Sequence, residues 1–232
     1  MARNKYPEET KRRIIEAAAG LFMEKGYDNT SIDDITGRLD GLTKGAVYHH
    51  FRSKEEIYDA VLYQVTSSVD DELMAVVNSK GLNGREKLKQ LFAKSMTAAV
   101  QNEISALAPD YSKNPKLLYQ MLLECKNEIA PLFLLPVIQE GIQDGSIESD
   151  SPRELSEFLA FVLNFWLNPC VIPCSAEESL RKFKFFSQVL KAFQLDLMEE
   201  PLMEKVKEFA EKGSCRKQEN LYRHFYLESG IS

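Results

Sequence analysis

The stretch TSIDDITGRLDGLTKGAVYHHFRSKEEIY, residues 30–58, decides the fold of this chain. It predicts two short helices around a tight turn, followed by a third helix with its own cap. Thr30 and Ser31 are suitable caps for the first helix, because their side-chain oxygens can accept hydrogen bonds from its free N–H groups. That helix is expected to end at Asp40-Gly41, where glycine tolerates a positive φ, and Thr43 can cap the next one. The layout is typical of a helix-turn-helix that reads DNA.

The second of these helices is slim at its start and polar on its outer side. Gly45 and Ala46 have small side chains, while Val47 and Phe51 lie four residues apart and are expected to face inward. A slim helix can enter the major groove, and its outer side offers a cation, a phenol hydroxyl and imidazole donors for phosphates and base edges. These groups belong to Lys44, Tyr48, His49 and His50.

The third helix begins with Ser53-Lys54-Glu55-Glu56, which has the pattern of a capping box. Lys54, at the start of this helix, can also contact a phosphate of the DNA backbone. A purely structural interpretation also exists. Tyr48 could be a half-buried packing residue, and His49 and His50 could be exposed without binding anything. The three capped helices together favour DNA contact, because packing alone does not require a glycine-led helix with a polar aromatic face.

Short segments spread over residues 9–65 carry a resemblance to a known family. They are Ile14-Ile15-Glu16-Ala17-Ala18, Leu21-Phe22, Glu24-Lys25-Gly26-Tyr27, Thr30-Ser31-Ile32, Asp34-Ile35, Lys44 to Phe51 and Ser53 to Glu56. This region, about a quarter of the chain, resembles the DNA-binding domain of TetR-family transcriptional regulators. One departure concerns the turn: the family usually has an Ala-Gly pair soon after the isoleucine of the second helix, whereas Leu39-Asp40-Gly41-Leu42 is one residue longer. We expect the extra residue to widen the turn.

The resemblance implies an all-α protein, in which a three-helix DNA-binding domain precedes a larger helical domain that binds an effector and dimerises. It also implies that the family's DNA contacts fall on the matching positions of this chain. The candidate contacts are Thr30, Ser31, Thr43, Lys44, Gly45, Ala46, Tyr48, His49, His50 and Lys54.

Charge is distributed unevenly along the chain. The formal net charge of −6 argues against indiscriminate binding of nucleic acid. Residues 1–54 contain ten Lys or Arg and eight Asp or Glu, so this segment carries +2 and the remainder −8. We expect a local positive surface there, although Lys11-Arg12-Arg13 could equally be a solvated helix face. The candidate cations are Lys5, Lys11, Arg12, Arg13, Lys44, Arg52 and Lys54.

Length and hydropathy limit the possible classes of protein. A chain of 232 residues can form a small domain and a larger one, each with a core, and a hydrophobic content of 44% is ordinary for a globular protein. No apolar run approaches the length of a membrane span, and the start, MARNKYPEETKRR, lacks the apolar core of a signal peptide. We therefore expect a cytoplasmic protein with no membrane partner.

Beyond residue 53 the pattern is helical throughout, without strand alternation. The expected helices span residues 54–80, 85–107, 115 onward, 131–141 with a bend near Pro136, 151–169 and 175–193, with Ser151 opening a capping box. The expected regions are a helix-turn-helix domain at 1–53, a connecting helix at 54–80, an effector-binding and dimerisation domain at 81–213, and a tail at 214–232. The tail could dock as a short helix or fray.

The last two helices carry more large apolar side chains than one buried face needs. The excess predicts a homodimer interface, since in the resembled family the last two long helices pair with their twins in a four-helix bundle. The alternative is that they form only the core of a monomer. A two-fold dimer places two reading helices in successive major grooves, so we expect double-stranded operator DNA of roughly palindromic sequence.

The sequence offers little chemistry of its own. It has no HExxH motif, glycine-rich phosphate loop or nucleophile elbow, and we expect no enzyme activity, cofactor or metal. Cys170 and Cys174 could form a redox-sensitive disulfide or half of a metal site, but no second pair completes four ligands. Ordinary loop cysteines are the simpler interpretation.

The resemblance implies a small-molecule effector between the helices of residues 85–170. Tyr119 and Asn164 are suitable polar groups to orient a mostly apolar guest, although a stripe of Met and aromatic residues is also what a plain core looks like. The candidate lining is Phe92, Met96, Tyr119, Met121, Cys125, Phe133, Asn164 and Trp166.

The expected function is a ligand-responsive, sequence-specific transcriptional regulator, and repression released by the effector is the commoner outcome in the family. The effector would change the spacing of the reading helices through the connecting helix. Two alternatives remain open at the level of sequence: a redox-responsive regulator that uses Cys170 and Cys174, and a small-molecule carrier that binds no operator.

Overall fold

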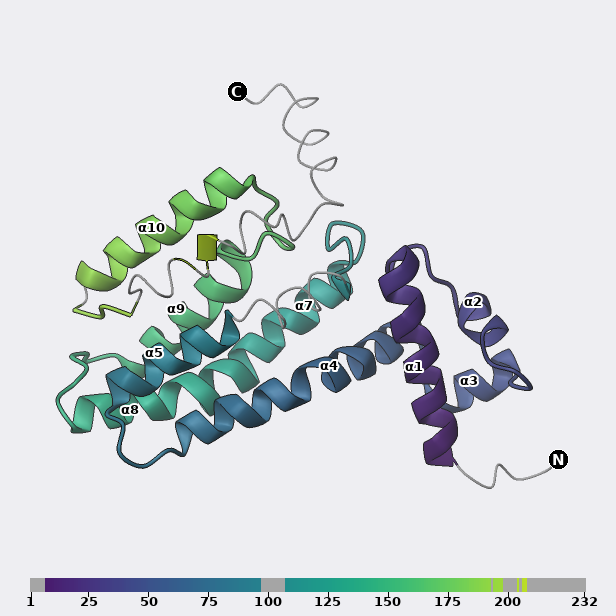
Figure 1. Ribbon diagram of the computed structural model, residues 1–232, viewed down its shortest axis with the longest axis horizontal. Coiled ribbons are helices and arrows are strands. Elements are labelled where there is room, and N and C mark those ends of the chain that lie inside the picture. The colour runs from purple at the N-terminus through teal and green to yellow at the C-terminus, as the bar shows by residue number, and fades with distance from the viewer. Residues whose placement is uncertain (1–6, 97–106, 193, 198–203, 205, 208–232) are drawn as a thin grey trace. The chain divides into compact units, whose positions relative to one another are not determined.

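The computed structural model describes most of the chain, namely residues 7–96, 107–192, 194–197, 204 and 206–207. Every regular element within these ranges is a helix, which confirms the prediction of an all-α fold (Figure 1). The predicted tail at 214–232 lies outside the described residues.

Two compact units divide the chain. Unit 1 consists of Met1–Ser68 with Ala106–Asp110, and unit 2 consists of Val69–Ser105 with Tyr111–Ser232. Helix α4, Lys54–Val77, contributes to both units, because it runs across the boundary after residue 68.

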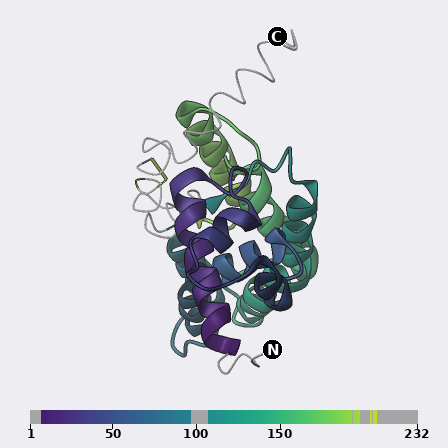
Figure 2. The same cartoon turned by 90° about the vertical axis from the view of Figure 1, so that its right-hand side faces the viewer.

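Unit 1 contains the helix-turn-helix in the predicted order. Helix α1 (Pro7–Lys25) is followed by α2 (Ile32–Gly37) and α3 (Lys44–His50), and α4 begins at Lys54. Helix α2 contacts both α1 and α3, and Figure 2 shows α1 with the two short helices beside it.

The N-terminal caps of α2 and α3 explain why two short helices hold their places. Ser31 Oγ accepts a hydrogen bond from the Asp34 N–H at 3.1 Å, and the Asp34 carboxylate accepts one from the Ser31 N–H at 2.7 Å. This reciprocal pair is a capping box. Thr43 Oγ1 accepts from the Ala46 N–H at 3.2 Å and thereby caps α3.

Helix α2 ends earlier than the sequence predicts, at Gly37 and not at Asp40-Gly41. Glycine is a weak helix former, and Leu39, which is 6% exposed, turns into the core after it. Gly41 has the predicted positive φ, +77°, within the turn.

The core of unit 1 combines an aromatic cluster with aliphatic side chains. The ring centroids of Phe22, Tyr27 and Tyr58 lie between 5.0 and 6.1 Å apart, and all three rings are buried. Their fully buried aliphatic neighbours in this unit include Ile14, Ile35, Val47, Ile57 and Val61. This core holds α3 by its inner face and leaves its outer face to the solvent.

Unit 2 is a bundle of helices that begins with the last part of α4. Its elements are α5 (Gly84–Ser95), α7 (Pro115–Glu124), the π-helix η1 (Cys125–Leu134), α8 (Leu135–Gln143), α9 (Pro152–Phe161), the π-helix η2 (Val162–Trp166) and α10 (Ala176–Ala192). A helix is predicted at 85–107. Ten of its residues, 97–106, lie outside the described ranges.

Two predictions about unit 2 are wrong in detail. The helix predicted at 131–141 is part of one irregular rod from Pro115 to Gln143, and Pro131 lies inside η1, whereas Pro136 lies in the first turn of α8. A proline without an N–H breaks the α-helical ladder, so the irregularity falls at Pro131. Ser151 makes no side-chain cap to α9, because its backbone is not extended (φ −134°, ψ 63°).

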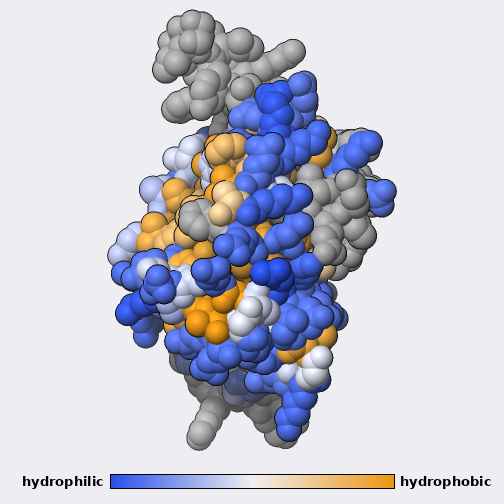
Figure 3. Space-filling model, turned by 90° about the vertical axis from the view of Figure 1, so that its left-hand side faces the viewer, coloured by the Kyte–Doolittle hydropathy of each residue, from blue (hydrophilic) through white to orange (hydrophobic). Residues whose placement is uncertain are grey.

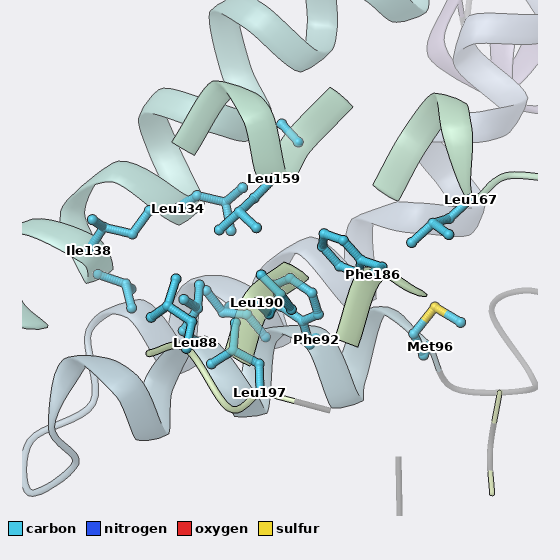
Figure 4. Packing of buried hydrophobic residues seen from close by; sticks show 14 of the residues in the cluster. Leu88, Phe92, Met96, Leu134, Ile138, Leu159, Leu167, Phe186, Leu190 and Leu197 are labelled. Atoms are coloured by element: carbon cyan, nitrogen blue, oxygen red, sulfur yellow. The ribbon is translucent and has the colours of Figure 1, made fainter. Parts of the chain in front are cut away.

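The core of unit 2 brings α5, α8, α9 and α10 together (Figure 4). Phe92 of α5 and Phe186 of α10 stack with their ring centroids 6.4 Å apart. Helices α5 and α8 approach closely at two glycines, since a Cβ on Gly84 would lie 2.3 Å from the Gly141 Cα. No described helix is long and apolar enough to cross a lipid bilayer.

Candidate nucleic-acid interface

Helix α3 presents the polar face that the sequence predicts for a reading helix. Val47 is fully buried and Phe51 is 4% exposed, so the helix is held by its inner side. Tyr48 on the outer side is 47% exposed, and His49 is also exposed. A phenol hydroxyl and an imidazole are therefore accessible donors and acceptors.

Gly45 lies in the first turn of α3, where unit 1 does not require a glycine. A Cβ at this position would meet only Thr43 Oγ1, at 3.8 Å, which is an ordinary van der Waals distance. The backbone there is ordinary helix, so no positive φ requires glycine either. The absence of a side chain leaves the start of α3 slim on its outer side.

Lys44 at the first position of α3 forms an ion pair with Asp33 of α2. Its Nζ lies 2.8 Å from Asp33 Oδ1 and 2.9 Å from Oδ2, and both side chains are largely exposed. The hydrogen bond to Asp33 raises the pKa of Lys44, so the ammonium is charged but locally neutralised. The sequence pattern does not indicate Asp33 as a residue beside the DNA-binding surface; the available signal is its position in the first turn of α2.

His49 and His50 lie with their ring centroids 5.4 Å apart in an edge-to-face arrangement. His50 is partly buried, and burial lowers its pKa below the ordinary value, with a further lowering by His49 and Lys11 and an opposing effect of Glu8. Of these two imidazoles, His49 is the exposed one.

Lys54 has a more internal position than a simple phosphate contact requires. Its Nζ donates to the carbonyl oxygens of Tyr27 at 2.9 Å and Thr30 at 3.0 Å, and it lies 4.1 Å from the centroid of the Tyr27 ring. Burial lowers the pKa of Lys54. The start of α4 is thereby tied to the loop between α1 and α2.

The side chains of Thr30 and Ser31 form hydrogen bonds within unit 1. Thr30 is 2% exposed, and its hydroxyl donates to the Gly26 carbonyl at 2.8 Å, so its side chain has no surface to offer to DNA. Ser31 Oγ serves as the cap of α2. These two candidates shape the helix-turn-helix from within.

Several of the other candidate cations in unit 1 have carboxylate or carbonyl partners. Arg12 pairs with Glu16 at 2.6 Å, and Arg13 reaches the Asp40 carbonyl at 3.4 Å. Lys11 lies 5.9 Å from the centroid of the Phe51 ring. Lys5 lies outside the described residues.

The eight candidate effector-binding residues do not form a single cluster in unit 2. Phe92 and Met96 belong to the same hydrophobic core (Figure 4). Trp166 packs against that core. Tyr119 is 60% exposed, and the Asn164 amide donates to the Ala160 carbonyl within its own helix. The remaining candidates are the buried Cys125 and the partly buried Met121 and Phe133.

The cysteines give no support to a redox switch or a metal site. Cys170 and Cys174 are thiols and not a disulfide, and burial raises the pKa of Cys174. A protonated thiol reacts slowly with oxidants. Within the ranges that the structure describes, no group of three His, Cys, Asp or Glu is placed to hold a metal ion.

These features define a class: a helix-turn-helix protein with a separate helical unit. Residues 14–61 match the sequence family described as bacterial regulatory proteins, tetR family. The HTH-type transcriptional repressor KstR2 of Rhodococcus jostii (strain RHA1) is 31% identical over 169 residues, which are 67% of this chain and 78% of that protein. The Transposon Tn10 TetC protein of Escherichia coli is 26% identical over 193 residues, covering 82% and 93%.

A solved structure has a similar fold. A TetR-family transcriptional regulator from Pectobacterium atrosepticum superimposes with a TM-score of 0.60 at 22% identity, covering 82% of this chain and 97% of that one. The chain belongs to the TetR family, which confirms the resemblance of its helix-turn-helix. It is a DNA-binding transcriptional regulator.

Proposed function

We propose that this chain is a homodimeric repressor that covers a roughly palindromic operator and leaves it when a small molecule binds unit 2. The observation that carries the DNA-binding surface is α3, whose inner face is fixed by Val47 while Tyr48 and His49 are exposed. Gly45 allows this face to approach a duplex closely. The surface includes Thr43, Lys44 and Ala46 at the start of the helix.

The proposed regions keep their expected roles. Residues 1–53 read DNA, residues 54–80 connect, and residues 81–213 bind the effector and dimerise in the cytoplasm. An apolar effector is best placed near Phe92 and Met96, because both belong to the buried cluster and Trp166 packs against that cluster.

Dimerisation is proposed through α9 and α10. Phe158 of α9 is 42% exposed and Phe185 of α10 is 56% exposed, although both are large apolar side chains. Trp166 lies against Phe185 with 6.0 Å between ring centroids, so the end of η2 continues the same surface. Figure 3 shows, on one face of the molecule, hydrophobic surface among hydrophilic side chains. A second copy of the chain would cover exposed aromatic rings of this kind.

Selection of bound duplexes from a random pool tests the proposal. Wild-type protein should enrich one roughly palindromic sequence, and Tyr48→Ala should weaken binding and blur the preference at the contacted bases. A small-molecule carrier would enrich no sequence while still binding a guest. Failure to enrich any duplex would refute the proposed function.

A further inference from the structure

The positively charged lysine of α3 forms an ion pair with a carboxylate of the same protein. Lys44 is the one Lys or Arg in the sequence of α3, KGAVYHH, and both carboxylate oxygens of Asp33 lie within 2.9 Å of its ammonium. Asp33 comes from α2, so the pair bridges the two helices of the helix-turn-helix. The reading helix therefore presents a cation whose nearest counterion belongs to the protein.

Asp33 is also distinct from its acidic neighbour. Asp34 closes the capping box with Ser31 and pairs with Lys25 at 2.8 Å, so the fold uses it fully. These hydrogen bonds, led by that from Lys25, hold the pKa of Asp34 well below its usual range. Asp33 takes no part in the capping box, and its side chain is 71% exposed, beside the candidate DNA surface.

An exposed carboxylate beside Lys44 acts against binding to arbitrary DNA. Non-specific affinity depends on Lys and Arg side chains that neutralise phosphates. Asp33 competes with the DNA phosphates for Lys44, and its negative charge also repels these phosphates directly. A base edge can compensate for this, because a carboxylate accepts a hydrogen bond from the N4 amino group of cytosine in the major groove.

We propose that Asp33 is a specificity-determining residue, which withholds Lys44 from the phosphates of arbitrary duplexes and is satisfied by an amino group of the operator. This inference rests on the proposed DNA-binding function. It assigns to the operator a cytosine, or another exposed donor, at the position that the start of α2 reaches. The competing interpretation is that the ion pair only fixes α2 against α3.

Asp33→Asn separates the two interpretations. It keeps the shape of the side chain and removes its charge, and the exposed position lets the fold tolerate it. Fluorescence anisotropy would measure binding to a random-sequence duplex and to the selected operator over a series of KCl concentrations. We expect random-duplex affinity to rise roughly three- to tenfold, with a salt slope steeper by about 0.9, which is one additional phosphate contact.

Operator affinity should change much less, so that the ratio of operator to random-duplex affinity falls. If Asp33→Asn leaves random-duplex affinity unchanged, or lowers both affinities together with thermal stability, the pair is only structural and the inference is wrong. If wild-type protein binds no duplex, the proposed function itself fails, and the two failures are thus distinguishable.

Two matched variants test whether the effect passes through Lys44. Glu24→Gln also removes one negative charge from unit 1, where Glu24 binds Arg38 through both carboxylate oxygens at 2.8 Å. An equal gain with Glu24→Gln would mean that only net charge matters and would overturn the proposal. In a Lys44→Met background, Asp33→Asn should no longer add a phosphate contact. If Asp33→Asn still made the salt slope steeper by about 0.9 in this background, the proposal would also be wrong.

Discussion

A glycine at position 45 could serve either the internal structure of unit 1 or the close approach of a ligand. Unit 1 leaves room for a Cβ at this position, and helix propensity favours alanine over glycine by up to about 1 kcal/mol. Internal packing and backbone conformation therefore give no reason for glycine. Close approach to a ligand is the remaining physical reason, because glycine is used where a backbone must lie against another surface.

Gly45→Ala should therefore leave the thermal unfolding temperature unchanged or slightly raised, while weakening operator binding. The added methyl group occupies space between α3 and the duplex. Differential scanning fluorimetry and anisotropy on the same samples provide the measurement. Gly37→Ala, at the last position of α2 with nothing within 4 Å of its Cβ, is the control for a general effect of alanine. Equal operator affinity of Gly45→Ala and wild type would remove Gly45 from the interface.

We expect His50 to give opposite pH dependences to the stability of the free protein and to its binding of a duplex. Burial lowers the pKa of His50 in the folded protein, whereas the unfolded chain titrates near the ordinary value of 6.5. The stability that comes from neutral His50 is thus fully present above pH 6.5 and is lost as the pH falls toward the lower folded value. The phosphates of a bound duplex would favour the protonated imidazole, so we expect duplex affinity to rise as the pH falls over the same range.

Acidification from pH 7.5 to 5.5 should therefore lower the unfolding temperature of the free protein and strengthen duplex binding. His50→Gln should reduce both effects. His49→Gln is the matched control, because His49 is exposed and its loss should change binding more than stability. A wild-type stability profile identical to that of His50→Gln would contradict the assignment.

Local chemistry explains which residues of the interface could be predicted. Ser31, Gly41 and Thr43 act on neighbours within four residues, and the sequence identifies their turn and caps correctly. Thr30 and Lys54 could not be placed in this way. Lys54 takes its carbonyl partners from residues 24 and 27 positions away, a pairing that only the packing of α4 against the α1–α2 loop creates.

At the scale of elements, Lys54 joins the start of α4 to the loop that supports the helix-turn-helix. Two of its N–H groups donate to the Tyr27 and Thr30 carbonyls. An effector that displaces α4 would move this loop through these hydrogen bonds. Lys54 is a positioning residue in this arrangement.

Lys54→Met should destabilise the protein by about 2 kcal/mol, since two carbonyl groups lose a charged donor. It should also weaken duplex binding, with the salt slope almost unchanged. A direct phosphate contact would instead lower the slope by about 0.9. Urea unfolding and salt-dependent anisotropy measure the two quantities, and a reduced slope with wild-type stability would return Lys54 to the phosphate contacts.

In unit 2, the presence of a helix is easier to predict from the sequence than its regularity. Apolar spacing and proline positions locate the helical segments from 115 to 192, and most of their starts agree with the structure. The sequence does not separate the π-helices η1 and η2 from the α-helices before them, because each continues directly from its predecessor without a side-chain cap. Pro131 is a local cause of such a turn, whereas η2 contains no proline.

At the scale of the whole molecule, the proposed palindromic operator requires two copies of α3 held together. One half-site gives each copy only its own contacts, while a dimer converts the second binding event into an intramolecular one. Exposed Phe158 and Phe185 are the side chains through which we propose that α9 and α10 pair with a second copy. Dimerisation and operator affinity should therefore fall together when these rings are replaced.

The double variant Phe158→Glu/Phe185→Glu should sediment as a monomer at micromolar concentration, because association would bury four carboxylates in an apolar contact. Its affinity for the full operator should fall about a hundredfold or more, toward its affinity for a half-site. Tyr119→Glu, on an exposed ring of α7, is the control and should leave both properties intact. A double variant that remains dimeric would place the interface elsewhere. A monomer that still binds the full operator with wild-type affinity would show that one α3 suffices and that the palindrome is unnecessary.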